Sequence, residues 1–158
     1  MKIVVVSDTH QSSAEMKNII FPKHQDEAQM VLHLGDYAKD IKGLQSIFPS
    51  YKMEWVGGAY ESSEAQEKIL EVAGKKILIM HGHTKGVKEG LQRIVSYAQS
   101  KGVDACFFGH THQATVFEVE GIFFMNPGHL SVPVFAPKSY GVVEISDSGE
   151  ITGQVLEL

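Results

Sequence analysis

The 158-residue chain is long enough to form a hydrophobic core without disulfide bonds, so we expect residues 1–158 to fold as a single domain. Its formal net charge of −5 and its lack of a Lys/Arg cluster argue against nucleic acid as an obligate partner, because nucleic acid requires a basic surface. The first apolar run, residues 3–6, is too short for a signal-peptide core or a membrane span. We therefore expect a cytoplasmic protein without a membrane partner.

Apolar runs alternate with polar stretches in the first two thirds of the chain, as they do in α/β domains. Strands are predicted there at residues 3–6, 30–34, 53–56, 69–72, 77–80 and 105–108, and helices at 13–21, 41–48 and 87–100. After Gly109 the sequence changes to strands joined by tight turns, predicted at 114–119, 122–125, 140–145 and 151–156. These elements favour an α/β fold of two sheets packed face to face, parallel early and antiparallel late, with helices outside.

Aspartate and histidine residues follow four of the predicted strands. In α/β sheets the carboxyl ends of the strands form the crevice in which ligands bind, so we expect these side chains to converge on one place. The glycines beside them would let the backbone turn sharply and come close to a bound metal. The four segments are Ser7-Asp8-Thr9-His10, Gly35-Asp36, His81-Gly82-His83 and Gly109-His110-Thr111-His112.

Six of these residues form a candidate ligand set that mixes carboxylates and imidazoles. This mixture suits Mn²⁺, Fe²⁺, Zn²⁺ or Co²⁺ better than Ca²⁺ or a thiolate-binding metal. A structural zinc site is disfavoured, because such sites are usually rich in cysteine. Six groups exceed one tetrahedral site, so two ions about 4 Å apart are expected, with Asp36 as the bridge. One ion would take Asp8, His10 and His112, and the other would take His81 and His110.

The remaining histidines and the cysteine have simpler interpretations. His24 lies in a polar loop and His33 inside a strand, so both are expected to be structural. His83 and His129 are candidates for orienting the ligands or contacting substrate. Cys106 lies in an apolar run and is expected to be a buried strand residue in a reducing compartment rather than a nucleophile.

The four segments, in this order and spacing, resemble the motifs of the calcineurin-like metallophosphoesterases, and most closely those of the small YfcE/MJ0936-type phosphodiesterases. Asn126-Pro127-Gly128 also resembles a segment of that family. The resemblance implies a four-layer α/β/β/α sandwich of two mixed sheets flanked by helices. It implies two divalent metal ions, with Mn²⁺ expected and Fe, Zn, Co or Ni as alternatives. A metal-bridging hydroxide would then hydrolyse a small phosphodiester or phosphomonoester.

One segment departs from the family pattern, which reads Gly-Asn-Cys-Asp where this chain has Gly58-Ala59-Tyr60-Glu61. By this alignment Ala59 replaces an asparagine ligand, so the second metal site is expected to be weak unless Glu61 or a water molecule fills the position. Tyr60 stands at the general-acid position, where it either protonates the leaving oxygen or lines the pocket. His129 stands where the family more often has serine and adds a candidate phosphate contact. The catalytic residues implied in this way are Asp36, His81, Tyr60 and His129.

Two functions from different classes remain open. A metal-dependent phosphoesterase should hold two ions per chain. A phosphoesterase-fold scaffold for protein interaction is suggested by Ala59 and by the resemblance to a retromer subunit of this superfamily. Such a scaffold should show weak or single metal occupancy and an exposed apolar patch. The motifs do not encode the substrate, the native metal or the oligomeric state, for which a homo-oligomer is one option.

Overall fold

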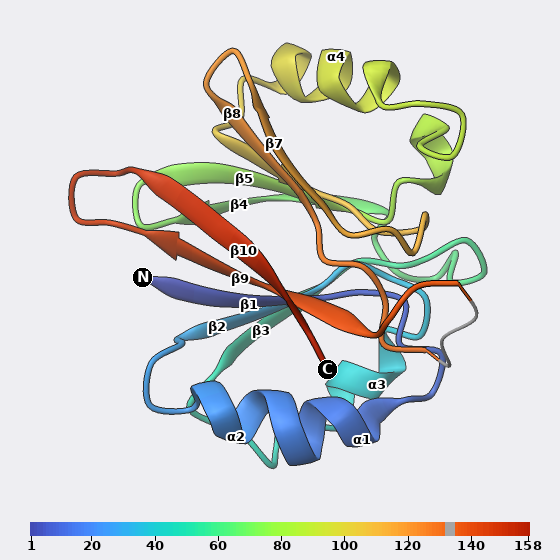
Figure 1. Cartoon of the computed structure of the whole chain (residues 1–158), viewed down its shortest axis with the longest axis vertical. Helices are drawn as coiled ribbons and strands as arrows, with labels where there is room; N and C mark the ends of the chain where they lie inside the picture. The colour runs from blue at the N-terminus through green and yellow to red at the C-terminus, as the bar shows by residue number, and fades with distance from the viewer. Residues whose placement is uncertain (132–134) are drawn as a thin grey trace.

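The computed structural model describes residues 1–131 and 135–158, and within them the strands form two five-stranded sheets that face each other (Figure 1). The first sheet, in spatial order, contains β10 (Ile151–Glu157), β9 (Ser139–Ile145), β1 (Lys2–Val6), β2 (Met30–His33) and β3 (Lys52–Trp55). The second contains β4 (Glu67–Val72), β5 (Lys75–Met80), β6 (Ala105–Phe107), β8 (Ile122–Asn126) and β7 (Thr115–Val119). Every strand predicted from the sequence is present.

Helices cover the outer faces of both sheets. Figure 1 shows one helical layer below the first sheet and another above the second, so the four-layer α/β/β/α arrangement is confirmed. Within the described residues, no helix is both long and apolar enough to cross a membrane. The lower layer contains α1 (Ser13–Glu15), a π-helical turn (Met16–Ile20), α2 (Phe21–His24) and α3 (Lys39–Lys42), and the upper layer contains α4 (Gln92–Lys101).

Strand β1 shows why the central strands are continuous apolar runs. Ile3 and Val5 point into the core between the two sheets, whereas Val4 and Val6 belong to the cluster under the π-helical turn and α2. Because side chains alternate between the two faces of a strand, a strand covered on both faces needs apolar residues at every position. Cys106 on β6 is fully buried, as predicted, and burial raises the pKa of its thiol.

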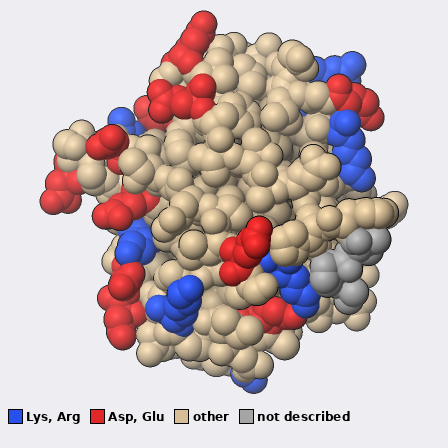
Figure 2. Space-filling model, in the orientation of Figure 1, with Lys and Arg blue, Asp and Glu red and all other residues tan. Residues whose placement is uncertain are grey.

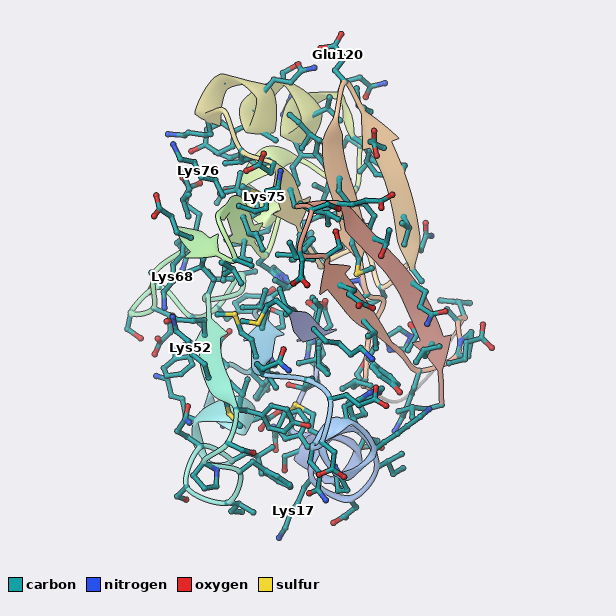
Figure 3. All side chains as sticks on the ribbon, turned by 90° about the vertical axis from the view of Figure 1, so that its left-hand side faces the viewer. Lys17, Lys52, Lys68, Lys75, Lys76 and Glu120 are labelled. Atoms are coloured by element: carbon teal, nitrogen blue, oxygen red, sulfur yellow. The ribbon has the colours of Figure 1, made fainter. Side chains whose placement is uncertain are left out.

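The expected order of parallel and antiparallel pairs is wrong at two places. Strands β4 and β5 pair antiparallel although they come early, because Ala73 and Gly74, both with positive φ, join them in a tight turn. Strands β6 and β8 pair parallel although β8 comes late. The first sheet is also mixed, because β1 pairs parallel with β2 and antiparallel with β9. Figure 3 shows Lys52 and Lys68 on the edge strands β3 and β4, where charged side chains discourage pairing with another chain.

The helices differ from the prediction in their boundaries. The helix predicted at 41–48 is only the short α3, which ends at Gly43, a poor helix former, and turns follow up to Pro49. The helix predicted at 87–100 begins only at Gln92, because Gly86 and Gly90 adopt positive φ values of 61° and 132°. The helix predicted at 13–21 extends to residue 24 and widens to a π turn before Pro22, which lacks an N–H donor.

Candidate metal centre

The six candidate ligands come from the carboxyl ends of four strands. Asp8 and His10 follow β1, Asp36 follows β2, His81 follows β5, and His110 and His112 follow β6. The structure brings their donor atoms together in two groups, in each of which the atoms lie within 4.8 Å of one another. We call Asp8, His10, Asp36 and His112 site 1, and Asp36, His81 and His110 site 2.

Asp36 belongs to both sites. Its Oδ2 lies 3.5 Å from His10 Nε2 in site 1, and its Oδ1 lies 3.4 Å from His81 Nε2 in site 2. Each carboxylate oxygen therefore faces a different group of donors. A carboxylate that bridges two ions requires this arrangement, and the division of the ligands between two ions stays a prediction.

Asp8 has an oxygen that the protein leaves unsatisfied. The side chain is fully buried, and its Oδ2 accepts hydrogen bonds from Ser7 Oγ at 2.6 Å and from the His110 backbone N–H at 3.1 Å. Its Oδ1 lies 3.1 Å from His112 Nε2 but accepts no hydrogen bond from the described residues. A buried carboxylate oxygen without a partner is costly, and a cation in site 1 would satisfy it.

The charge states of these groups favour cation binding. Burial alone raises the pKa values of Asp8 and Asp36, but neighbouring histidines outweigh it and hold both below their ordinary values. Burial, together with the charge of His81, lowers the pKa of His110 to about 4. Two ionised carboxylates and a neutral imidazole are the ligand states that a divalent cation requires.

The backbone is strained at most of the ligands. Five of the six candidate ligands have left-handed φ values, between 44° and 69°, and only His81 has an ordinary negative φ. Residues with side chains pay for this conformation, and such strain tends to persist at functional sites. The five residues are Asp8, His10, Asp36, His110 and His112.

Two glycines let the loops approach the carboxylates. A Cβ atom on Gly58 would lie 2.0 Å from Asp36 Oδ1, and one on Gly109 would lie 2.7 Å from Asp8 Oδ2. Real side chains cannot occupy these positions without displacing a ligand. Both glycines are therefore required by close approach to the site, as the sequence suggested for Gly109.

The loop after β3 places Ala59 against site 2 and keeps Glu61 out of it. The Ala59 backbone N–H donates to Asp36 Oδ1 at 3.2 Å. The Glu61 carboxylate accepts hydrogen bonds from the backbone N–H groups of Tyr37, Ala38 and Gly58 at 2.7 to 3.1 Å. Glu61 thus fastens the loop after β3 to the loop after β2, and it belongs to neither metal site in the described residues.

We expect Glu61→Ala to lower the free energy of unfolding by about 2 kcal/mol, because three backbone donors lose a charged acceptor. Urea unfolding followed by circular dichroism measures this change. Glu71→Ala is the matched control, since Glu71 is exposed on β4 and should shift stability by less than about 0.5 kcal/mol. Equal stabilities of the two variants would contradict the role assigned to Glu61.

The other candidates take different positions around the centre. Tyr60 is 96% exposed in the loop after β3. His129 is buried and its ring stacks on His112, with 4.9 Å between centroids, while its two nitrogens contact Ser131 Oγ and the Ala136 carbonyl. The His83 ring lies 5.4 Å from that of His81. His24 forms a hydrogen bond with Tyr140, and His33 forms one with Thr9, as expected for structural residues.

The motif analysis did not assign roles to several supporting residues. Asn126 Nδ2 donates to the Gly109 carbonyl at 3.0 Å and to Thr111 Oγ1 at 2.9 Å, so the asparagine holds the loop that carries His110 and His112. Its place in a family-like segment was the signal that could have identified it. Asp40 accepts hydrogen bonds from Thr9 Oγ1 at 2.7 Å and from the Gln11 backbone N–H at 2.9 Å, and no sequence pattern marked it.

Two pockets open beside the centre, and His10 lines both. The first, which we call the Tyr60 pocket, has a volume of about 420 Å³ and is lined by His10, Asp36, Tyr37, Lys39, Tyr60 and Glu61. The second, the Phe135 pocket, has a volume of about 620 Å³, and its lining includes His112, His129 and Phe135. Candidate ligands thus line two spaces, each large enough for part of a small molecule.

The geometry agrees with a comparison against known families. A model of the calcineurin-like phosphoesterase superfamily domain matches residues 1–148. The chain belongs to this superfamily. Its resemblance to metallophosphoesterase motifs is thereby confirmed, and the family implies divalent metal ions, for which the residues at the ends of β1, β2, β5 and β6 are candidate ligands.

Individual relatives extend the comparison. The chain is 26% identical over 148 residues to the probable metallophosphoesterase YsnB of Bacillus subtilis, covering 93% of this chain and 86% of that protein. It is 27% identical over 144 residues to the phosphodiesterase MJ0936 of Methanocaldococcus jannaschii, covering 81% and 83%. Wild-type Vps29 complexed with Zn²⁺ from Entamoeba histolytica matches with a TM-score of 0.75 at 21% identity over 99% of each chain, which shows a shared fold.

Proposed function

We propose that this chain is a metal-dependent phosphoesterase that hydrolyses a small phosphodiester at a pair of divalent ions, with Mn²⁺ as the first candidate. The observation that carries the proposal is the sharing of Asp36 by site 1 and site 2. Two bound ions would supply a nucleophile derived from water and positive charge against the phosphoryl oxygens. Because the protein has a formal net charge of −5, bound cations would supply the positive charge that attracts an anionic substrate.

The protein's own groups orient the ligands. His81 Nδ1–H donates to the Leu34 carbonyl at 2.8 Å, which fixes the ring with Nε2 directed at Asp36, where a cation would replace a proton on that nitrogen. The hydrogen bonds to Asp8 Oδ2 leave Oδ1 as the oxygen available to a cation. The stacked ring of His129 limits rotation of His112. His129 therefore acts in this proposal as a positioning residue, while Tyr60, at the rim, is the candidate proton donor.

The two pockets support a diester rather than a monoester. A phosphodiester carries two substituents on phosphorus, and the Tyr60 and Phe135 pockets share His10 as a lining residue. A monoester would fill only one of them. The two volumes can hold two substituents of moderate size.

We expect purified protein supplied with Mn²⁺ to hydrolyse bis(p-nitrophenyl) phosphate, with release of p-nitrophenol measured at visible wavelengths. Treatment with EDTA followed by gel filtration should abolish turnover, because both sites lose their cations, and added Mn²⁺ should restore it. Mg²⁺, which prefers oxygen ligands, should restore less. Turnover that survives complete removal of metal would refute the proposal.

The second candidate function is a phosphoesterase-fold scaffold for protein interaction. Ala59 favours it, because a methyl group adds no donor to site 2. A scaffold should retain at most one ion and should not hydrolyse any of the test esters, whereas the enzyme should bind two ions and turn over. Metal content measured on the same sample as turnover therefore separates the two functions.

A further inference from the structure

Lys39 lies beside the proposed metal centre, at the start of α3. Its side chain is exposed, and its Nζ lies 5.0 Å from the centre of the Tyr37 ring. The Tyr37 ring in turn lies 5.3 Å, between centroids, from the ring of His10. Both Lys39 and Tyr37 line the Tyr60 pocket. A cation–π contact thus holds a positive charge at the wall of a pocket that opens on site 1.

The described residues give Lys39 no counter-charge. No carboxylate of the described chain lies within 4.0 Å of its Nζ, although neighbouring Lys42 pairs with Glu64. The nearby acids are engaged elsewhere, since Asp40 accepts from Thr9 and Gln11, and Glu61 accepts from three backbone N–H groups.

Lys39 is also distinctive among the pocket residues. Of the described residues that line the Tyr60 and Phe135 pockets, it is the single lysine or arginine. Figure 2 shows that on the face it displays, Lys and Arg side chains are scattered rather than gathered into one basic patch. Within the described lining of the Tyr60 pocket, the Lys39 ammonium is the positive charge that an anion entering the pocket can contact.

We propose that Lys39 binds a second phosphate group of the substrate, carried on the substituent that occupies the Tyr60 pocket. The reacting phosphate lies at the metals, and a phosphate elsewhere on the same molecule contacts Lys39. Tyr37 and Tyr60 provide flat apolar surface for a ring between the two phosphates. The substrate class is therefore a phosphodiester with an additional terminal phosphate. This inference rests on the proposed phosphodiesterase function.

A matched pair of chromogenic substrates tests the proposal. Thymidine 5′-(p-nitrophenyl phosphate) is a diester without a second phosphate, and its 3′-phosphorylated derivative differs from it by that group alone. We expect the wild-type protein loaded with Mn²⁺ to prefer the 3′-phosphorylated diester about fivefold in kcat/KM, mainly through KM, which is the size of effect expected from an exposed ion pair.

Variants of Lys39 test whether this residue causes the preference for the 3′-phosphorylated diester. Lys39→Met should reduce the ratio of the two kcat/KM values to near one, and Lys39→Arg should retain most of the preference because it keeps the charge. Lys17→Met is the matched control, since Figure 3 shows Lys17 extending from the helical layer into solvent. A ratio that stays the same in Lys39→Met, or that falls equally in Lys17→Met, would overturn the proposal.

A binding measurement separates this inference from the proposed function. Calorimetric titration of the Mn²⁺-loaded protein with thymidine 3′,5′-bisphosphate and with thymidine 5′-phosphate needs no turnover. If Lys39→Met lowers the affinity for the bisphosphate but not the affinity for thymidine 5′-phosphate, the Lys39 contact is supported even if neither diester is hydrolysed. Equal affinity of wild type and Lys39→Met for the bisphosphate refutes the contact even if both diesters are hydrolysed.

Discussion

Asp36→Ala is expected to abolish hydrolysis of bis(p-nitrophenyl) phosphate, with a loss of at least about 100-fold in kcat/KM. Among the described residues, Asp36 alone contributes a donor atom to both site 1 and site 2, so its loss should weaken the binding of both ions at once. Substitution even of residues that merely support a ligand typically costs 10- to 100-fold in affinity or activity. Metal content should fall in parallel, and inductively coupled plasma mass spectrometry measures it directly.

Two further variants make the result specific. Asp36→Asn keeps the shape of the side chain and one oxygen but removes the charge, so it should fold like the wild type and still lose the second ion. Asp147→Ala removes a carboxylate from the exposed turn between β9 and β10 and should leave both turnover and metal content unchanged. Full activity in Asp36→Ala would show that the shared carboxylate does not hold the reactive centre.

Ala59→Asn is expected to tighten binding of the ion in site 2 by about tenfold or more. Site 1 offers four donor residues and site 2 only three, so site 2 should fill at higher metal concentration. The Ala59 backbone N–H already contacts Asp36 Oδ1 at 3.2 Å, so a side chain at residue 59 begins close to the site and can add an amide oxygen. The gain corresponds to restoring one ligand.

Calorimetric titration of metal-free protein with Mn²⁺ measures both sites in one experiment. The wild type should show one tight and one weak binding event, and Ala59→Asn should show two that are closer in affinity. Ala73→Asn is the matched control, because it makes the same chemical change in the exposed turn between β4 and β5. Two equally tight ions in the wild type would mean that another group or water completes site 2.

Periodicity accounted for the strands but not for the ends of the helices. Central strands such as β1 and β5 are buried on both faces, so their apolar runs are long and have few alternative interpretations. The helices are short and half exposed, and glycines decide where they end. A glycine is compatible with both helical and non-helical φ values, so the sequence did not reveal that Gly90 has a φ of 132°. The start of α4 at Gln92 could therefore be seen only in the structure.

The sequence identified the candidate ligands of the site, but it did not identify the residues that support the loops around them. Asp8, Asp36 and His110 were identifiable because each follows an apolar strand, and strand ends meet at one edge of a sheet. The roles of Glu61 and Asp40 could not be predicted, because hydrogen bonds to backbone N–H groups leave no pattern in the sequence.

Residue type and order along the chain were enough to predict the layered α/β architecture and the family, and they also led to the expectation that six candidate ligands divide around Asp36. Which polar groups already have hydrogen-bond partners became visible only in the folded chain. The tertiary structure showed Glu61 engaged by three backbone donors and both His129 nitrogens in contact with oxygens. It also placed the Lys39 ammonium over the Tyr37 ring at the pocket wall, with no carboxylate of residues 1–131 and 135–158 paired to it. The physical reason is that contacts between loops depend on distances and directions between segments far apart in the chain, and residue order alone does not specify them.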